Sequence, residues 1–226
     1  MSAFTGFGPG TEEFLSGLSE NNNKAWFDAH RAEYDEHYIA PAKAFVVAAG
    51  EALSRIAPNV SAEPKVNGSI FRINRDIRFS KDKTPYKDHL DMWFWEGAEK
   101  KAAVSGFFLR VRSDGIDIGV GSHGFDKDRL AVYREAVVDP TSGAALLSTV
   151  ETLERAGHEV KGEHYKRTPR GYEAEGDVER LLHFNALWTG ADDSPESLAT
   201  PEFVDYCVEQ WAAALPLHRW LTDTLQ

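Results

Sequence analysis

The segment AVSGFFLRVRSDGIDIGV, residues 103–120, limits the class of fold that the chain can adopt. Residues 103–112 and 116–120 are rich in β-branched and aromatic side chains, and they flank the turn formers Ser113, Asp114 and Gly115. Two such runs joined by a short turn with glycine predict a β-hairpin. Residues 90–95 (LDMWFW) predict a further strand. We therefore expect a mostly antiparallel sheet of about four or more strands.

Helices are predicted on both sides of these strands. In residues 11–57 apolar side chains recur with a helical period, and Thr11 is placed to cap the first helix. The helical period returns in residues 126–226, where it includes an amphipathic stretch at 178–187. The strands therefore lie between two helical parts of the chain.

The length of the chain favours one domain. Its 226 residues are enough for one sizeable core and few for two independent ones. We predict a single α+β domain, residues 1–226, whose sheet is packed by N-terminal and C-terminal helices. Its parts along the chain are helical 11–57, strand-rich 64–121 and helical 126–226.

Composition and charge narrow the classes of function. The formal net charge is −11, and a chain this acidic repels the phosphate backbone, which disfavours nucleic acid as a partner. The single cysteine, Cys207, excludes an intrachain disulfide and fits a reducing compartment. The first residues do not resemble a signal peptide, and no apolar run is long enough to cross a membrane. We expect a cytoplasmic protein with no membrane partner.

The most informative segment for function is FRINRDIRFSKDKTPYKD, residues 71–88, because its charge opposes that of the whole chain. It carries six basic and three acidic residues, a formal charge of +3. A basic island in an acidic protein is a place where an anion can bind. The candidate ligand-binding residues in this segment are Arg72, Arg75, Arg78, Lys83 and Lys87.

Strand geometry singles out Arg75 within this segment. If residues 71–79 are extended, Arg75 shares one face with four apolar side chains and points toward the core. A buried guanidinium requires a partner, which would be an internal carboxylate, backbone carbonyls or a bound anion. Alternatively, the chain bends at Arg75 and Asp76, and the guanidinium is not buried.

Acid–base candidates near the basic residues are Asp76 and Asp82. The same two carboxylates could instead neutralise the arginines, for example Asp82 with Arg78. Outside the segment, Arg170 lies on a loop rich in proline and glycine and could close over a bound anion. The histidines lack metal-ligand spacing, so no metal site is predicted, and no motif assigns a cofactor.

The motif FRINRDIRFSKDKTPYK resembles the hallmark of the family called domain of unknown function 2461. Two further matches are the N-terminal pattern that begins with FTGF at residues 4–7 and the motif KRTPRGY at residues 166–172. The resemblance spans most of the chain and implies a single domain. It implies no activity, because the family has none to carry over.

The leading hypothesis is a protein that binds a small phosphorylated or carboxylated ligand at the arginine and lysine cluster. An enzyme of unassigned class is included in it. The second hypothesis is a non-enzymatic interaction module whose basic segment docks an acidic partner. A third, binding of single-stranded nucleic acid by basic and aromatic side chains, is opposed by the acidity of the chain. The sequence assigns no oligomeric state.

Overall fold

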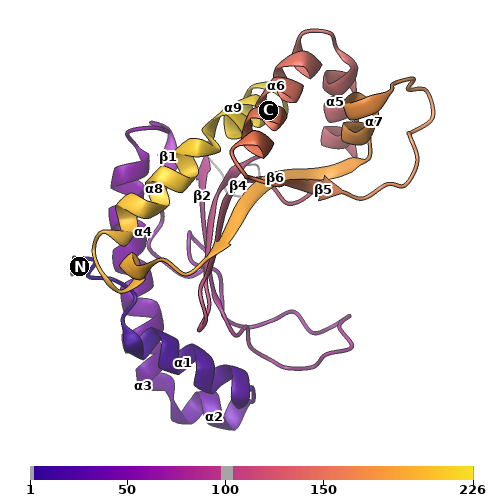
Figure 1. Cartoon of the computed structure of the whole chain (residues 1–226). Helices are drawn as coiled ribbons and strands as arrows, with labels where there is room; N and C mark the ends of the chain where they lie inside the picture. Colours follow the sequence, from indigo (N-terminus) through magenta and orange to yellow (C-terminus); the bar gives the residue numbers. More distant parts are fainter. Residues whose placement is uncertain (1–2, 98–103, 226) are drawn as a thin grey trace. The chain divides into compact units, whose positions relative to one another are not determined.

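The computed structural model of the protein describes residues 3–97 and 104–225 (Figure 1). It confirms the α+β class: within these residues a six-stranded antiparallel sheet has the order β1-β2-β3-β4-β6-β5, and helices precede and follow the strands. The predicted hairpin is confirmed as β3 and β4, which Arg112 N and Gly115 O close with a 2.8 Å hydrogen bond. The strands are β1 Val60–Ser61, β2 Leu90–Glu96, β3 Gly106–Val111, β4 Ile116–Ser122, β5 Val160–Glu163 and β6 Phe184–Asp193.

The chain divides into two compact units. The prediction of one domain over residues 1–226 therefore stays a prediction. The first unit comprises 1–100, 108–118 and 192–209, and the second comprises 101–107, 119–191 and 210–226.

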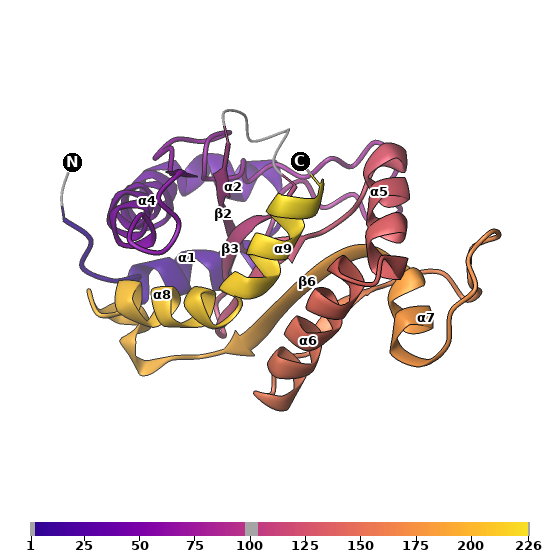
Figure 2. The same cartoon turned by 90° about the horizontal axis from the view of Figure 1, so that it is seen from above.

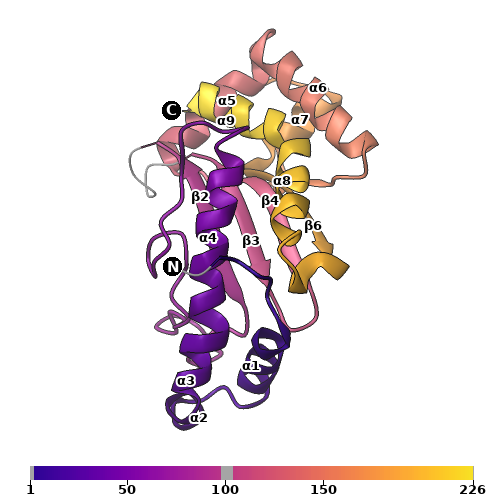
Figure 3. The same cartoon turned by 90° about the vertical axis from the view of Figure 1, so that its left-hand side faces the viewer.

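The core of the first unit lies between α4 and the sheet. Figure 3 shows α4 (Ala40–Leu53) running across β2 and β3. Phe45 of α4 is fully buried, and its ring contacts the rings of Phe94 on β2 and Phe203 on α8. The other helical segments of this unit are α1 Pro9–Glu20, α2 Lys24–Ala29, α3 Arg31–Glu33, a π-helical turn Tyr34–Ile39, a 3₁₀ turn Glu196–Ala199 and the beginning of α8 Phe203–Ala213.

The first helix begins earlier than predicted. It starts at Pro9, whose fixed φ suits the first turn, so Thr11 lies inside the helix and is not its cap. The Thr11 hydroxyl is instead buried and donates to the carbonyl of His37 at 2.6 Å. The next boundary is as expected for an asparagine cap, because Asn23 Oδ1 accepts from Trp26 N at the start of α2.

The second unit contains α5 (Lys127–Val138), α6 (Ser142–Arg155), α7 (Gly176–Leu182) and α9 (Leu215–Leu225). Figure 2 shows α7 beside α5, and these two helices are in contact. Phe107 and Trp211 are buried against each other in its core. The helical prediction for 126–226 is wrong where β5 and β6 lie.

The amphipathic stretch at 178–187 is a helix only as far as Leu182, and β6 begins at Phe184. In β6 the side chains of Phe184, Ala186 and Leu187 are buried, while Asn185 and Trp188 are half-exposed. This pattern of burial is closer to the two-residue period of a strand than to the period of a helix. Trp188 and Thr189 also favour a strand, because aromatic and β-branched residues are frequent in strands.

The strand-rich prediction for 64–121 is wrong between 66 and 88, where the described pairing consists of isolated bridges, such as Asn74 with Tyr86. Two aspartate side chains here accept hydrogen bonds from backbone N–H groups that a β-ladder would use. Asp76 accepts from Arg78 N, and Asp82 accepts from Thr84 N. The segment is therefore a long connection between β1 and β2. Of the predicted strand 103–112, Ala103 lies outside the described residues.

Candidate functional site

The basic segment 71–88 is held in shape by its own charges. Arg75 Nη1 donates to Asp82 Oδ2 at 2.5 Å, to the Thr84 carbonyl at 3.2 Å and also to the Thr84 hydroxyl. Its side chain is 29% exposed, and Ile73 rather than Phe71 or Phe79 is buried. Of the partners that the sequence left open for Arg75, the internal carboxylate and the backbone carbonyl are therefore present.

Arg78 and Lys83 are also engaged within the segment. The Arg78 guanidinium donates to both oxygens of Asp76, at 2.9 and 2.6 Å, and Lys83 Nζ donates to the Ile77 carbonyl at 2.8 Å. Arg72 is exposed. Arg75 and Arg78 thus each have one carboxylate, so each pair is neutral.

These ion pairs determine the ionisation state of Asp76 and Asp82, the two predicted acid–base residues. Hydrogen bonds from the Thr84 backbone and from Arg75 lower the pKa of Asp82 to about 2. The hydrogen bond from the Arg78 side chain lowers the pKa of Asp76. Both carboxylates are ionised at neutral pH and point at arginines, an arrangement that argues against a role in proton transfer.

The N-terminal helices also hold the basic segment. Asn22, between α1 and α2, donates from Nδ2 to the Tyr86 carbonyl at 2.9 Å and accepts from Tyr86 N at 3.0 Å. The Tyr86 ring stacks on Phe27 of α2 with 4.3 Å between the ring centroids. The Asn22 side chain therefore hydrogen-bonds both main-chain polar groups of Tyr86, as a paired strand would. It fixes the end of the segment next to β2.

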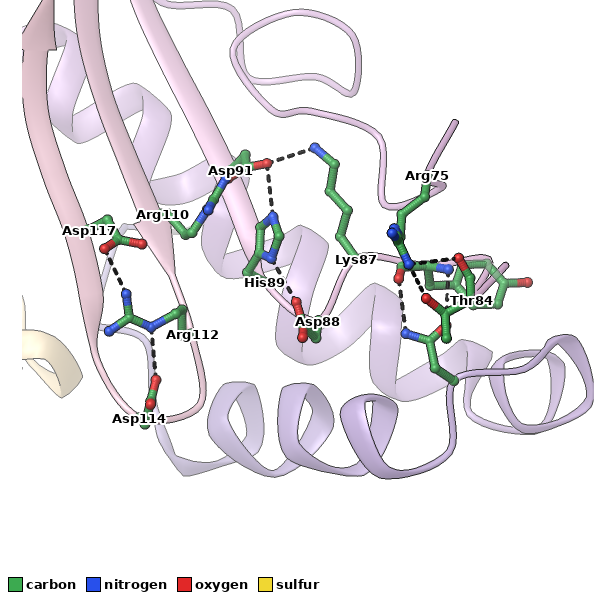
Figure 4. A network of polar contacts seen from close by, with 12 residues as sticks. Arg75, Thr84, Lys87, Asp88, His89, Asp91, Arg110, Arg112, Asp114 and Asp117 are labelled. Carbon is green, nitrogen blue, oxygen red and sulfur yellow. Dashed lines mark hydrogen bonds and ion pairs between the residues drawn. The ribbon is translucent and has the colours of Figure 1, made fainter. Parts of the chain in front are cut away.

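A different arrangement surrounds Asp91 at the start of β2 (Figure 4). Its Oδ2 accepts from Lys87 Nζ at 2.7 Å and lies 3.2 Å from His89 Nε2, while its Oδ1 accepts from Arg110 Nε at 2.7 Å. The Asp91 side chain is 16% exposed. Two permanent cations and one imidazole thus share a single, largely buried carboxylate.

The alternation of the strands brings these side chains together. Leu90 and Met92 of β2 and Leu109 of β3 are buried on one face of the sheet, so Asp91 and Arg110 project from the opposite face. Neither residue was among the candidates that the sequence suggested. The signal that could have found them is that each places a charge between two apolar residues of a strand.

The charges around Asp91 keep it ionised. Burial by itself raises the pKa of Asp91, but hydrogen bonds from His89, Arg110 and Lys87 outweigh burial and hold that pKa well below its ordinary value. Asp91 therefore serves as a fixed negative centre that orients three donors.

His89 lies between two carboxylates. Its Nδ1 is 2.8 Å from Asp88 Oδ1 and its Nε2 is 3.2 Å from Asp91 Oδ2. Both ring nitrogens are occupied by the protein, so neither is presented to a substrate in this arrangement. The cluster is therefore better suited to binding than to proton transfer.

Arg110 is the member of the cluster that faces outward. Its side chain is 42% exposed, and only Nε contacts Asp91. In the part of the chain that the structure describes, its two terminal nitrogens have no hydrogen-bond acceptor. The neighbouring Lys87 has its ammonium 5.0 Å from the centroid of the Phe71 ring.

Arg112, two residues further along the chain, shows the opposite balance of charge. It bonds Asp114, Asp117 and Asp192 at 2.9, 2.7 and 2.8 Å, and these carboxylates raise its pKa. Its charge is more than neutralised. Arg112 therefore ties the hairpin turn to the end of β6 and is not a candidate for an anion.

The predicted Arg170 lies in the second unit and is exposed on the loop that precedes α7. Since the contacts around Asp91 all come from the first unit, the role of Arg170 stays a prediction. Over residues 3–97 and 104–225, no group of three or more His, Cys, Asp or Glu side chains is arranged to hold a metal ion. No helix in those ranges is long and apolar enough to span a bilayer.

Comparison with known proteins identifies the family of the chain. The model of a family described as conserved hypothetical protein (DUF2461) matches residues 10–220. No curated protein and no solved structure matches the chain.

Proposed function

Since this chain belongs to the family called domain of unknown function 2461, which names no reaction, we propose from its contacts that it binds a small anionic ligand at Arg110 and Lys87. The ligand is a phosphorylated or carboxylated small molecule. The proposal keeps Lys87 from the residues that the sequence suggested and moves the centre of the site from the arginines of the connection to the sheet.

The observation that carries the proposal is that two cations share one carboxylate. Arg75 and Arg78 each have a carboxylate of their own, whereas Lys87 and Arg110 share Asp91. The other carboxylate of the cluster, Asp88, is 58% exposed and lies against His89, so among the described residues Lys87 and Arg110 have only Asp91 within ion-pair distance. An anion there would gain charge-assisted hydrogen bonds worth about 1.5–3 kcal/mol each.

The geometry of Arg110 favours an oxyanion. Its Nε is held by Asp91, so the plane of the guanidinium is fixed while its two terminal nitrogens remain available. Two parallel N–H donors match the spacing of carboxylate or phosphoryl oxygens. Asp91 thereby lowers the entropic cost of binding, because the arginine is oriented before a ligand arrives.

The proposal can be tested by ligand-induced thermal stabilisation with phosphate, sulfate, nucleotides and sugar phosphates. A ligand at a concentration of about 100 Kd stabilises the native state by about 2.7 kcal/mol. For a protein of this size each kcal/mol raises Tm by about 2–4 °C, so we expect a shift of roughly 5–10 °C for the best anion. Arg110→Gln should weaken binding at least about tenfold, because it removes charge-assisted bonds.

The matched control is Arg78→Gln, which removes the same charge from an arginine that has its own carboxylate, Asp76. It should keep the ligand-induced shift. If Arg78→Gln abolished the shift and Arg110→Gln kept it, the anion would bind on the connection and not on the sheet. If no anion in the panel shifted Tm, anion binding would be wrong.

A further inference from the structure

The tip of the basic segment, residues 76–83, exposes an aromatic side chain that the anion site does not use. Phe79 is 94% exposed, and the neighbouring Ile77 is half-exposed. Figure 1 shows the connection between β1 and β2 extending away from the strands. A large apolar side chain this exposed costs solvation free energy of about 1.5–3 kcal/mol relative to burial, so its placement calls for an explanation.

The tip is braced and does not collapse onto the protein. Arg75 joins its two ends through Asp82 and Thr84, and the Lys83 ammonium binds the Ile77 carbonyl at 2.8 Å. Asp76 caps the Arg78 backbone N–H at 3.2 Å. These bonds hold the main chain on both sides of Phe79, so the ring is presented outward.

Three basic side chains close to Phe79 in the sequence are not paired with a carboxylate in the described part of the chain. Asp76 and Asp82 are taken by Arg78 and Arg75. Among the residues that the structure describes, Arg72, Lys81 and Lys83 have no carboxylate within ion-pair distance, and all three are exposed. The tip therefore combines one projecting apolar group with two exposed cations of its own, Lys81 and Lys83, and Arg72 precedes it in the chain.

We propose that this tip contacts an anionic lipid surface, with Phe79 inserted among the headgroups and the cations on the phosphates. Each cation near such a surface contributes about 1 kcal/mol to the free energy of membrane binding, and an aromatic side chain in the interface contributes further. The negative charge of the rest of the chain is screened beyond about 8 Å at physiological ionic strength. The expectation of no membrane partner was based on the lack of a spanning segment, which a peripheral contact does not need.

A bilayer suits the tip better than other acidic partners. A stable protein interface buries about 800 Å² on each side around a packed apolar centre, and the tip supplies only one ring and part of Ile77. Single-stranded nucleic acid stacks successive bases on several aromatic side chains, and the tip supplies one ring, Phe79. Insertion into lipid needs only apolar surface.

The test is sedimentation of the purified protein with vesicles of phosphatidylcholine, with and without about 30% phosphatidylserine, at about 0.1 and 0.5 M salt. Wild type should sediment with the anionic vesicles at low salt only. Phe79→Ala should lower the partition coefficient about tenfold, and Lys81→Gln about fivefold. The controls Val47→Ala and Lys43→Gln change an exposed apolar and an exposed basic residue of α4 and should bind as wild type.

Equal partition of Phe79→Ala and wild type, or no binding of wild type to the anionic vesicles, would overturn the proposal. Binding to an oligothymidine that Phe79→Ala abolishes, without binding to vesicles, would overturn it too and assign the tip to single-stranded nucleic acid. The inference does not depend on the anion site, because Arg110 and Lys87 are unchanged in these variants.

Discussion

Replacing Asp91 by asparagine is expected to lower the free energy of unfolding by about 2–4 kcal/mol. The variant keeps the shape of the side chain but removes the carboxylate that Lys87, His89 and Arg110 share. Removing one partner of a fully buried pair costs about 3–5 kcal/mol, and the lower value reflects partial rehydration of the half-exposed Arg110. Urea denaturation at neutral pH measures the change.

The pH dependence separates lost charge from lost packing. The pKa of folded Asp91 lies below the ordinary value of 3.8, so its carboxylate stabilises the native state fully above that value. The contribution is lost as the pH falls through 3.8 toward the lower, folded pKa. The difference between wild type and Asp91→Asn should thus be constant from about pH 7 to 5 and shrink below about pH 4.

The control for this variant is Asp114→Asn. Asp114 also pairs with an arginine, Arg112, but its side chain is 78% exposed. Exposed ion pairs contribute about 0–1 kcal/mol, so this variant should remain within that range of wild type. If both variants lost the same stability, Asp91 would be an ordinary surface ion pair and not a buried centre.

The second large effect is expected for Phe45→Ala, which should lower the free energy of unfolding by about 3–5 kcal/mol. Phe45 is fully buried on α4 and contacts the rings of Phe4, Phe7, Phe94 and Phe203. Truncation leaves a cavity among rings that come from separate segments, and these cannot all shift to fill it. Urea denaturation followed by tryptophan fluorescence would report the change.

Val47→Ala on the same helix is the matched control. Val47 is 41% exposed, so losing its methyl groups should change stability by less than about 0.5 kcal/mol. A loss below about 1 kcal/mol for Phe45→Ala would show that the cluster collapses around the smaller side chain. That result would contradict the view that α4 is fixed to the sheet by this ring.

The sequence predicted the elements whose local signals are strong. The β3–β4 hairpin is the clearest case, because its turn formers and the two flanking runs lie within a few residues of one another. Strand β6 was missed because a short apolar run fits a helix as well as a strand. Its identity depends on pairing with β5, for example Val160 with Thr189, which local sequence does not show.

The candidate site illustrates the same limit. The sequence located the basic segment and Lys87, but not which cations would be neutralised. Arg75 pairs with Asp82 seven residues away and Lys87 with Asp91 four residues away, whereas Arg110 meets Asp91 only because β2 and β3 are neighbours in the sheet. Charge counts along the chain cannot distinguish these cases, since ion pairs depend on strand order and on which face each side chain occupies.

The double hydrogen bond between Asn22 and Tyr86 has a consequence for protein engineering. Residues 71–88 could not be transplanted into another scaffold as an autonomous peptide, because the main chain of Tyr86 is completed by a side chain 64 residues upstream. A host would have to supply an amide in the same position. Without it, the N–H and the C=O of the buried Tyr86 would each lose the partner that Asn22 supplies.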